Sequence, residues 1–126
     1  MKFSGKNVLV TGSSRGIGAE IAKVLASYGL KVWINYRSGA AEADAVKEAI
    51  EAEGGQAAVI GFDVSDEAAF IDAVKTIVES DGELSYLVNN AGITNDKLAL
   101  RMKTEDFMSV INANLTSAFI GCREFF

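Results

Sequence analysis

The feature that most constrains the fold is a glycine-rich segment near the N-terminus, with the sequence TGSSRGIG at residues 11–18. It follows a short run of β-branched and apolar residues, 7–11, which predicts a buried strand. It leads into residues 16–28, where apolar residues (Ile17, Ile21, Val24, Leu25 and Tyr28) recur at helical spacing. A glycine-rich turn from a strand into a helix brings free N–H groups and the positive end of the helix dipole together. The segment therefore predicts a site for a phosphorylated ligand.

Each glycine of this segment has its own expected role. Gly12 lets the chain turn sharply out of the strand, Gly16 leaves room for a pyrophosphate, and Gly18 allows close packing of the helix on the sheet. An ATP-binding P-loop would need a lysine directly after its second glycine, which lies five residues beyond the first. Ile17 and Gly18 occupy those two positions, so the P-loop interpretation fails.

The rest of the chain alternates between strand-like and helix-like segments. We expect further strands at residues 31–36, 56–62 and 84–89, and further helices at 40–53, from a Ser65 cap to about Ser80, and from a Thr104 cap onward. The apolar stripe of the helix after Ser65 is Phe70, Val74, Ile77 and Val78. Four strands alternating with four or five helices predict an α/β fold, a Rossmann-like doubly wound parallel sheet with strand order 3-2-1-4. We expect residues 1–126 to form a single, incomplete dinucleotide-binding domain of this type.

Composition excludes several classes of function. The chain has 126 residues, a formal net charge of −5, one cysteine and no histidine. Without histidine, Ser-His-Asp and Cys-His mechanisms are excluded, and no Cys/His cluster indicates a zinc site. The negative charge and the lack of a basic stretch argue against nucleic acid and anionic membranes as partners. Because the sequence shows neither a signal peptide nor a membrane-spanning run, we expect a soluble, cytoplasmic protein.

The residues near position 36 indicate which dinucleotide the site prefers. An NAD-preferring site usually places an acid at the end of the second strand, about 20 residues after the glycines. The sequence there is Asn35-Tyr36-Arg37-Ser38, which contains no acid, and Arg15 lies within the glycine loop. Either arginine alone is more often a solvated surface group. Two guanidinium groups near one ribose suit a 2′-phosphate, so the pair favours NADP(H).

The pattern Thr-Gly-x-x-x-Gly-x-Gly at residues 11–18 resembles the fingerprint of the short-chain dehydrogenase/reductase family. The resemblance covers essentially the whole chain, to about Glu124, and it implies roles for individual residues. The cofactor would be bound by the loop residues Gly12, Ser13, Ser14, Arg15, Gly16, Ile17 and Gly18, by Arg37, by Asp63 and Val64 at the adenine, and by Asn90, Ala91, Gly92 and Ile93 at the ribose.

The resemblance also implies a catalytic residue. From spacing alone, Asn114 is better explained as a structural amide on an apolar helix face. The resemblance changes this interpretation, because Asn114 matches the family's catalytic asparagine, which holds a water in the proton relay. The family also needs a serine and a Tyr-x-x-x-Lys pair, and no such pair occurs in this sequence. The resemblance places these residues after position 126, so we expect a truncation or frameshift and no turnover by this chain alone. We also expect the isolated chain to be poorly soluble or molten.

Within the family, residues 90–94, 96–98 and 101–103 look like the bacterial 3-oxoacyl-[acyl-carrier-protein] reductases. That resemblance implies NADPH-dependent reduction of a 3-oxoacyl group on acyl carrier protein in fatty-acid biosynthesis, by a homotetramer. Two alternatives stay open. The first is another short-chain reductase with a small carbonyl substrate, and the second is a non-catalytic nucleotide-binding fragment.

Overall fold

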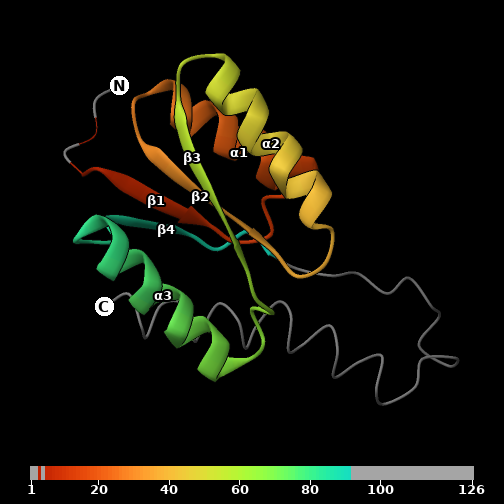
Figure 1. The fold of residues 1–126 in the computed structure, drawn as a ribbon, viewed down its shortest axis with the longest axis vertical. Coiled ribbons are helices and arrows are strands. Elements are labelled where there is room, and N and C mark those ends of the chain that lie inside the picture. The colour runs from red at the N-terminus through yellow and green to blue at the C-terminus, as the bar shows by residue number, and fades with distance from the viewer. Residues whose placement is uncertain (1–2, 4, 92–126) are drawn as a thin grey trace, which may run out of the picture.

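The computed structural model describes residues 3 and 5–91, which form a four-stranded sheet with helices on both faces (Figure 1). The elements in chain order are β1 (Asn7–Val10), α1 (Gly16–Ser27), β2 (Lys31–Tyr36), α2 (Ala40–Ala52), β3 (Gln56–Gly61), α3 (Glu67–Asp81) and β4 (Tyr86–Val88). All the strand pairs are parallel, and the strand order is β3-β2-β1-β4. The predicted fold class and strand order are therefore confirmed. The helix expected after Thr104 lies outside the described residues.

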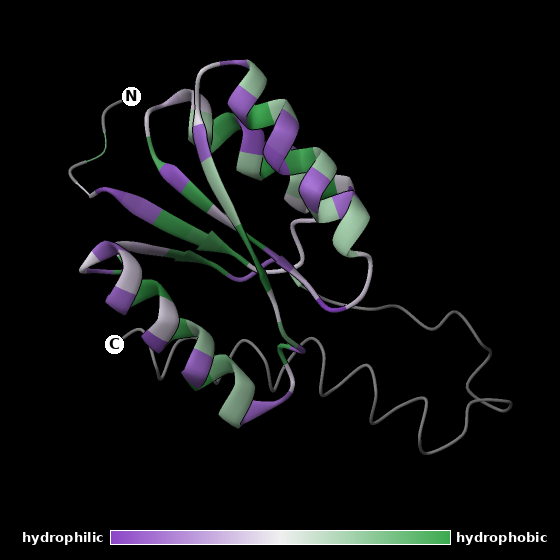
Figure 2. Ribbon diagram, viewed as in Figure 1, coloured by the Kyte–Doolittle hydropathy of each residue, from purple (hydrophilic) through white to green (hydrophobic). Residues whose placement is uncertain are grey.

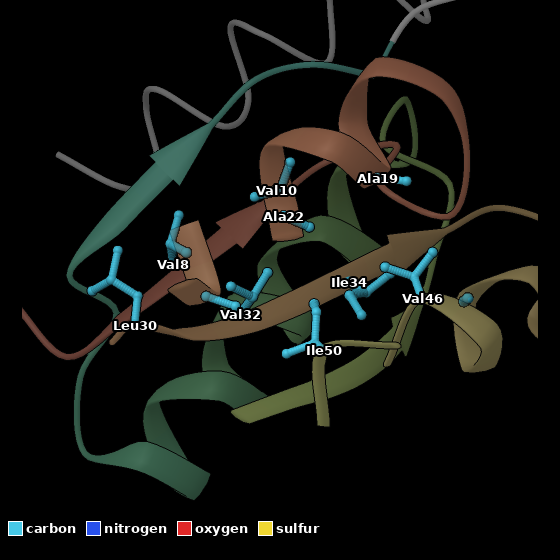
Figure 3. Packing of buried hydrophobic residues seen from close by; sticks show 11 residues of the cluster. Val8, Val10, Ala19, Ala22, Leu30, Val32, Ile34, Val46 and Ile50 are labelled. Atoms are coloured by element: carbon cyan, nitrogen blue, oxygen red, sulfur yellow. The ribbon is translucent and has the colours of Figure 1, made fainter. Parts of the chain in front are cut away.

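Side chains of β1 and of the middle of β2 are buried on both faces of the sheet, whereas those of β3 and β4 are at most partly buried. Successive side chains of a strand point in opposite directions, so Val8 and Val10 of β1 pack in a cluster with α1 and α2, whereas Leu9 packs in a second cluster with α3. Figure 3 shows the first cluster, and Figure 2 shows largely apolar strands between helices that carry both polar and apolar residues. The second cluster contains Leu9, Trp33, Phe62, Val64, Phe70, Ala73 and Ile77. These two layers hold the sheet between the helices.

The path of the chain determines where a ligand site is expected, at the carboxyl ends of the strands. From β1 the chain moves outward to β2 and then β3, with α1 and α2 on one face. It then crosses through α3, on the other face, and returns to β4 beside β1. In open α/β sheets, ligands bind outside the carboxyl ends of the strands at the point where the order reverses. Here that point lies between β1 and β4.

The buried residues of α1 are small, whereas the sequence indicates the helix by larger apolar residues. Ile17 is 75% exposed and Val24 is 52% exposed, while the buried residues are Gly18, Ala19, Ala22 and Ala26. Tyr28, just after the helix, is 47% exposed. Small side chains let the helix axis approach the sheet closely, so alanine and glycine cover β1 and β2 in place of longer residues.

The start of α3 also differs from the prediction. Asp66, one residue after Ser65, is the N-cap, and its carboxylate accepts a hydrogen bond from the N–H of Ala69 at 3.1 Å. Ser65 instead donates to Asp63. Within the predicted stripe Phe70 and Ile77 are buried, but Val78 is 41% exposed and Ala73 is buried instead. Ser65 and Asp66 are both good capping residues, so sequence alone did not separate them.

A polar network ties α3 to the amino ends of the strands. Asp81 accepts hydrogen bonds from Lys31 at 2.7 Å, from Asn7 at 2.9 Å and from the indole of Trp33 at 2.7 Å. Burial opposes ionisation of Asp81, but these three donors outweigh it and lower its pKa to about 2. The charged carboxylate therefore fastens the end of α3 to β1 and β2. Among the described helices, none is long and apolar enough to span a membrane.

Candidate functional site

A cavity of about 600 Å³ lies at the carboxyl ends of the strands, in the size range of small-molecule sites. Segments that follow all the strands contribute to its wall. The lining residues are Gly12, Ser14, Arg15, Ile17, Gly18, Asn35, Tyr36, Arg37, Ser38, Phe62, Asp63, Val64, Asn90 and Ala91. The cavity therefore lies where the strand order predicts a ligand site, and the glycine loop forms part of its wall.

The glycine loop needs its glycines for backbone geometry and for space. Gly12 has a φ of +64°, which L side chains rarely adopt, and a Cβ there would lie 2.8 Å from the Cα of Ala91. A Cβ on Gly18 would collide with the carbonyl oxygen of Gly12 and lie 2.5 Å from Nδ2 of Asn90. The roles expected of Gly12 and Gly18 agree with this packing.

Asn35 holds the glycine loop from the end of β2. Its side chain is buried, and its Oδ1 accepts a hydrogen bond from the N–H of Gly12 at 2.9 Å. Its Nδ2 donates to the carbonyl oxygen of Phe62 at 3.2 Å, beyond the end of β3. Its main chain exchanges two further bonds with Ser13, whose hydroxyl donates to Val10. One amide therefore joins the ends of three strands.

Thr11 and Asn90 hold the other side of the loop. The hydroxyl of Thr11 accepts the N–H groups of Asn90 and Ala91, both at 3.0 Å. The amide of Asn90 donates to the carbonyl oxygens of Thr11 and Gly12, both at 3.2 Å. The loop after β1 and the segment after β4 are consequently locked together on the cavity wall.

The N-terminus of α1 is suited to an anion. Its N-cap is Arg15, no side chain caps its free N–H groups, and its first turn contains no acid. The free N–H groups and the helix dipole favour a negative group placed there. By contrast, the N-terminus of α3 is capped by the carboxylate of Asp66. The end of α1 beside the cavity is therefore available to a phosphate.

Arg37 and Asp63 form an ion pair on the cavity wall. Nε of Arg37 lies 3.4 Å from Oδ2 of Asp63, and their side chains are 68% and 38% exposed. Partial burial opposes ionisation of Asp63, but hydrogen bonds from Ser65 and the charge of Arg37 lower its pKa below the usual value of 3.8. Asp63 is thus a carboxylate, and Arg37 stands beside it at the end of β2.

The structure brings most of the predicted site residues together. Ten of them line the cavity: Gly12, Ser14, Arg15, Ile17, Gly18, Arg37, Asp63, Val64, Asn90 and Ala91. Ser13 does not line it, because it is fully buried and bonded to Val10 and Asn35. Gly16 borders a separate hollow on the outer side of α1. Gly92, Ile93 and Asn114 lie outside the described residues.

The cavity also contains residues that the sequence did not single out: Asn35, Tyr36, Ser38 and Phe62. Asn35 carried a usable signal, because an asparagine among apolar strand residues needs hydrogen-bond partners once it is buried. Two of its partners, Gly12 and Phe62, lie 23 or more residues away in the sequence, so spacing alone did not reveal them.

Comparison with known proteins assigns the family. Residues 6–126 match the short chain dehydrogenase family. The chain belongs to the short-chain dehydrogenase family. A 3-oxoacyl-[acyl-carrier-protein] reductase from Synechocystis is 46% identical over 112 residues, which are 89% of this chain and 45% of the relative. The chain thus spans about half the length of such short-chain dehydrogenases.

Solved short-chain dehydrogenases share the fold. A dehydrogenase/reductase from Sinorhizobium meliloti is 40% identical, with a TM-score of 0.93 over 98% of this chain and 49% of that chain. A short chain dehydrogenase from Burkholderia cenocepacia, solved in complex with NADP, is 39% identical with a TM-score of 0.92. That match covers 99% of this chain and 51% of the other. The Rossmann-like fold of the family is therefore the fold of this chain.

Proposed function

We propose that this chain is the NADP(H)-binding part of a short-chain oxidoreductase. The observation that carries the proposal is the position of Arg37, which follows β2 on the wall of the cavity that the glycine loop forms. An NAD-preferring site usually has an acid at that strand end. Asp63, after β3, is the only acid among the described lining residues, and it pairs with Arg37. A guanidinium at this place suits a 2′-phosphate.

The described residues fit the parts of the cofactor. The uncapped N-terminus of α1 and the Gly12–Gly18 segment suit the pyrophosphate, and Arg15 and Arg37 suit the 2′-phosphate. We assign Asp63 and Val64 to the adenine. We assign Asn90 and Ala91 to the ribose, together with Gly92 and Ile93. When bound, NADPH supplies the hydride that reduces a carbonyl; the residues described here bind and orient it.

For the whole protein we propose a 3-oxoacyl group carried by acyl carrier protein as the substrate, reduced to the 3-hydroxyacyl product in fatty-acid biosynthesis. The support is the similarity to reductases of that name from Synechocystis and Staphylococcus aureus. A cytoplasmic homotetramer is part of the same proposal. The alternative substrate is another small carbonyl compound, since fold and cofactor do not choose between substrates.

We further propose that these 126 residues do not turn over substrate alone, because their sequence contains no Tyr-x-x-x-Lys pair. Asn114 is the catalytic residue we propose within the chain. In a chain extended with the C-terminal half of a related reductase, Asn114→Ala should lower kcat by about 100-fold or more while the Kd for NADPH stays unchanged. A parallel loss of NADPH binding would show a structural amide instead.

Cofactor titration tests the proposal. The chain extended with the C-terminal half of a related reductase should bind NADPH more tightly than NADH, and Arg15→Ala with Arg37→Ala should weaken its NADPH binding far more than its NADH binding. Lys6→Ala with Lys23→Ala removes two exposed cations outside the cavity and is the matched control. Equal losses for both cofactors would contradict the NADP(H) assignment.

The extended chain separates the alternatives. Turnover of acetoacetyl thioesters supports the 3-oxoacyl substrate, and turnover of small ketones alone supports a different short-chain reductase. Cofactor binding without any turnover would favour a nucleotide-binding module.

A further inference from the structure

Ser65 holds one carboxylate oxygen of Asp63 by two hydrogen bonds and leaves the other oxygen to interact with Arg37. The N–H and the hydroxyl of Ser65 both donate to Oδ1 of Asp63, at 2.9 and 2.7 Å. The turn between β3 and α3 therefore sets the plane of the carboxylate. The second oxygen, Oδ2, is the one that faces Arg37.

The ion pair engages a particular edge of the guanidinium. The contact of 3.4 Å is made by Nε, at the side of the group. A guanidinium has five N–H donors in a planar fork, and four of them are on the two terminal nitrogens. A contact at Nε thus leaves the terminal pair for bidentate recognition of an oxyanion.

The pair also bridges two segments that the backbone already joins. The N–H of Phe62 donates to the carbonyl oxygen of Tyr36 at 3.0 Å, so the ends of β2 and β3 are bonded directly before Arg37 and Asp63. The carboxylate consequently belongs to a fixed frame beside the arginine.

Given the NADP(H) site proposed above, we infer that Asp63, oriented by Ser65, is a positioning residue for Arg37 and sets selectivity for the 2′-phosphate. Asp63 aims the guanidinium through Nε, and Arg37 itself contacts the phosphate. This role is additional to any contact of Asp63 with adenine, which NADPH and NADH share. It therefore changes the affinity for NADPH relative to that for NADH, whereas loss of a contact with adenine would weaken the binding of both.

Two opposite effects of Asp63 can be separated by sign. If positioning dominates, removing the charge lets Arg37 leave the 2′-phosphate, and NADPH binds more weakly. If repulsion between Asp63 and the phosphate dominates, the same change makes NADPH bind more tightly. Because the contact with Asp63 is made at Nε and leaves the terminal nitrogens of Arg37 for the phosphate, we expect positioning to dominate. The pair is exposed, so the expected change is about two- to fivefold.

The experiment is titration of the chain extended with the C-terminal half of a related reductase, and of its variants, with NADPH and with NADH. Asp63→Asn keeps the shape of the side chain, and it should raise the Kd for NADPH relative to that for NADH by two- to fivefold. Ser65→Ala keeps the carboxylate but releases it, and should shift the ratio in the same direction. Ser65→Thr retains the hydroxyl and should restore the ratio. In an Arg37→Ala background, Asp63→Asn should no longer raise the ratio, because only the repulsion between Asp63 and the phosphate remains.

If Asp63→Asn leaves the ratio of the Kd values for NADPH and NADH unchanged, or makes NADPH bind more tightly, the inference is overturned. The cofactor assignment stands in either case. A wild-type chain that does not prefer NADPH overturns the proposed function and the inference together. A second readout needs no cofactor: the ¹⁵N resonance of Arg37 Nε should move on Asp63→Asn and on Ser65→Ala but not on Ser65→Thr. A resonance that ignores these changes also overturns the inference.

Discussion

Oδ1 of Asn35 accepts the N–H of Gly12 across 23 residues of sequence, at 2.9 Å. This bond decides where the first glycine of the loop sits relative to β2. The same amide donates toward the end of β3, so the loop cannot shift without disturbing two strand ends. The geometry of the phosphate-binding loop therefore depends on a residue outside the glycine motif.

Asn35→Ala should lower both stability and cofactor affinity. It strands the N–H of Gly12 and the carbonyl oxygen of Phe62, and we expect a loss of about 1–3 kcal/mol in the free energy of unfolding. Below the unfolding transition, NADPH should bind about fivefold more weakly. Urea denaturation and fluorescence titration measure the two effects.

Asn7→Ala is the matched control for that change. Asn7 is 1% exposed and bonded to Asp81, Glu83 and Ser85, at the opposite end of β1 from the cavity. It should cost similar stability but leave the affinity of the folded chain for NADPH unchanged. A similar loss of affinity in both variants would contradict a specific role of Asn35 in the loop.

Gly18→Ala should damage the site through contact alone. The added methyl group would collide with the carbonyl oxygen of Gly12 and would lie 2.9 Å from the Cα of Ser13. Overpacking of this kind costs about 1–3 kcal/mol. We expect loss of NADPH binding together with a lowered Tm. Gly29→Ala, after the other end of α1, meets nothing within 4 Å but has an unfavourable φ of +92°. It should lower Tm and spare binding; unchanged binding by Gly18→Ala would refute the packing argument.

Substitutions on α1 should separate its exposed and buried faces. Val24 is 52% exposed, so Val24→Ser should change the free energy of unfolding by less than about 0.5 kcal/mol. Ala22 is fully buried against the sheet, so Ala22→Val should cost about 1–3 kcal/mol. Urea denaturation of both variants checks this, and the opposite ranking would mean that Val24 faces the core.

Asp81 should make stability depend on pH in the acid range. Its pKa is about 2 in the folded chain and 3.8 ordinarily, so folding favours the charged form. The contribution is complete above pH 4 to 5 and is lost as pH falls toward 2. A shift of this size corresponds to about 2 kcal/mol. The wild-type chain should therefore exceed Asp81→Asn in stability by that amount at pH 6, with the difference shrinking below pH 4.

The exposed Asp44 on α2 offers a control for the loss of one carboxylate. Asp44→Asn should follow the wild-type pH profile of unfolding. If the gap between wild type and Asp81→Asn stays constant from pH 6 to pH 2, the network around Asp81 does not act through its charge.

The sequence predicted the strands and helices and the position of the loop, because periodicity and glycine spacing are local signals. The strand order followed from the right-handed crossover rule and the glycine motif. The sequence did not predict which side of α1 is buried, because Ala22 and Val24 both fit a helical pattern. Only the packing of the helix on the sheet shows that Ala22 is buried and Val24 is exposed. The sequence also missed Asn35, whose role depends on partners brought near by the parallel pairing of β1, β2 and β3. Polar contacts between strand ends are set by tertiary structure and leave little trace in the sequence.

The three residues proposed to select the cofactor, Arg15, Arg37 and Asp63, lie on the cavity wall within the first 63 residues of the chain. If they make that choice, it is written in one short stretch of the gene. A single crossover downstream of Asp63 would then carry a cofactor preference from one short-chain dehydrogenase to another. Coenzyme usage would be inherited as a block, separately from the rest of the chain.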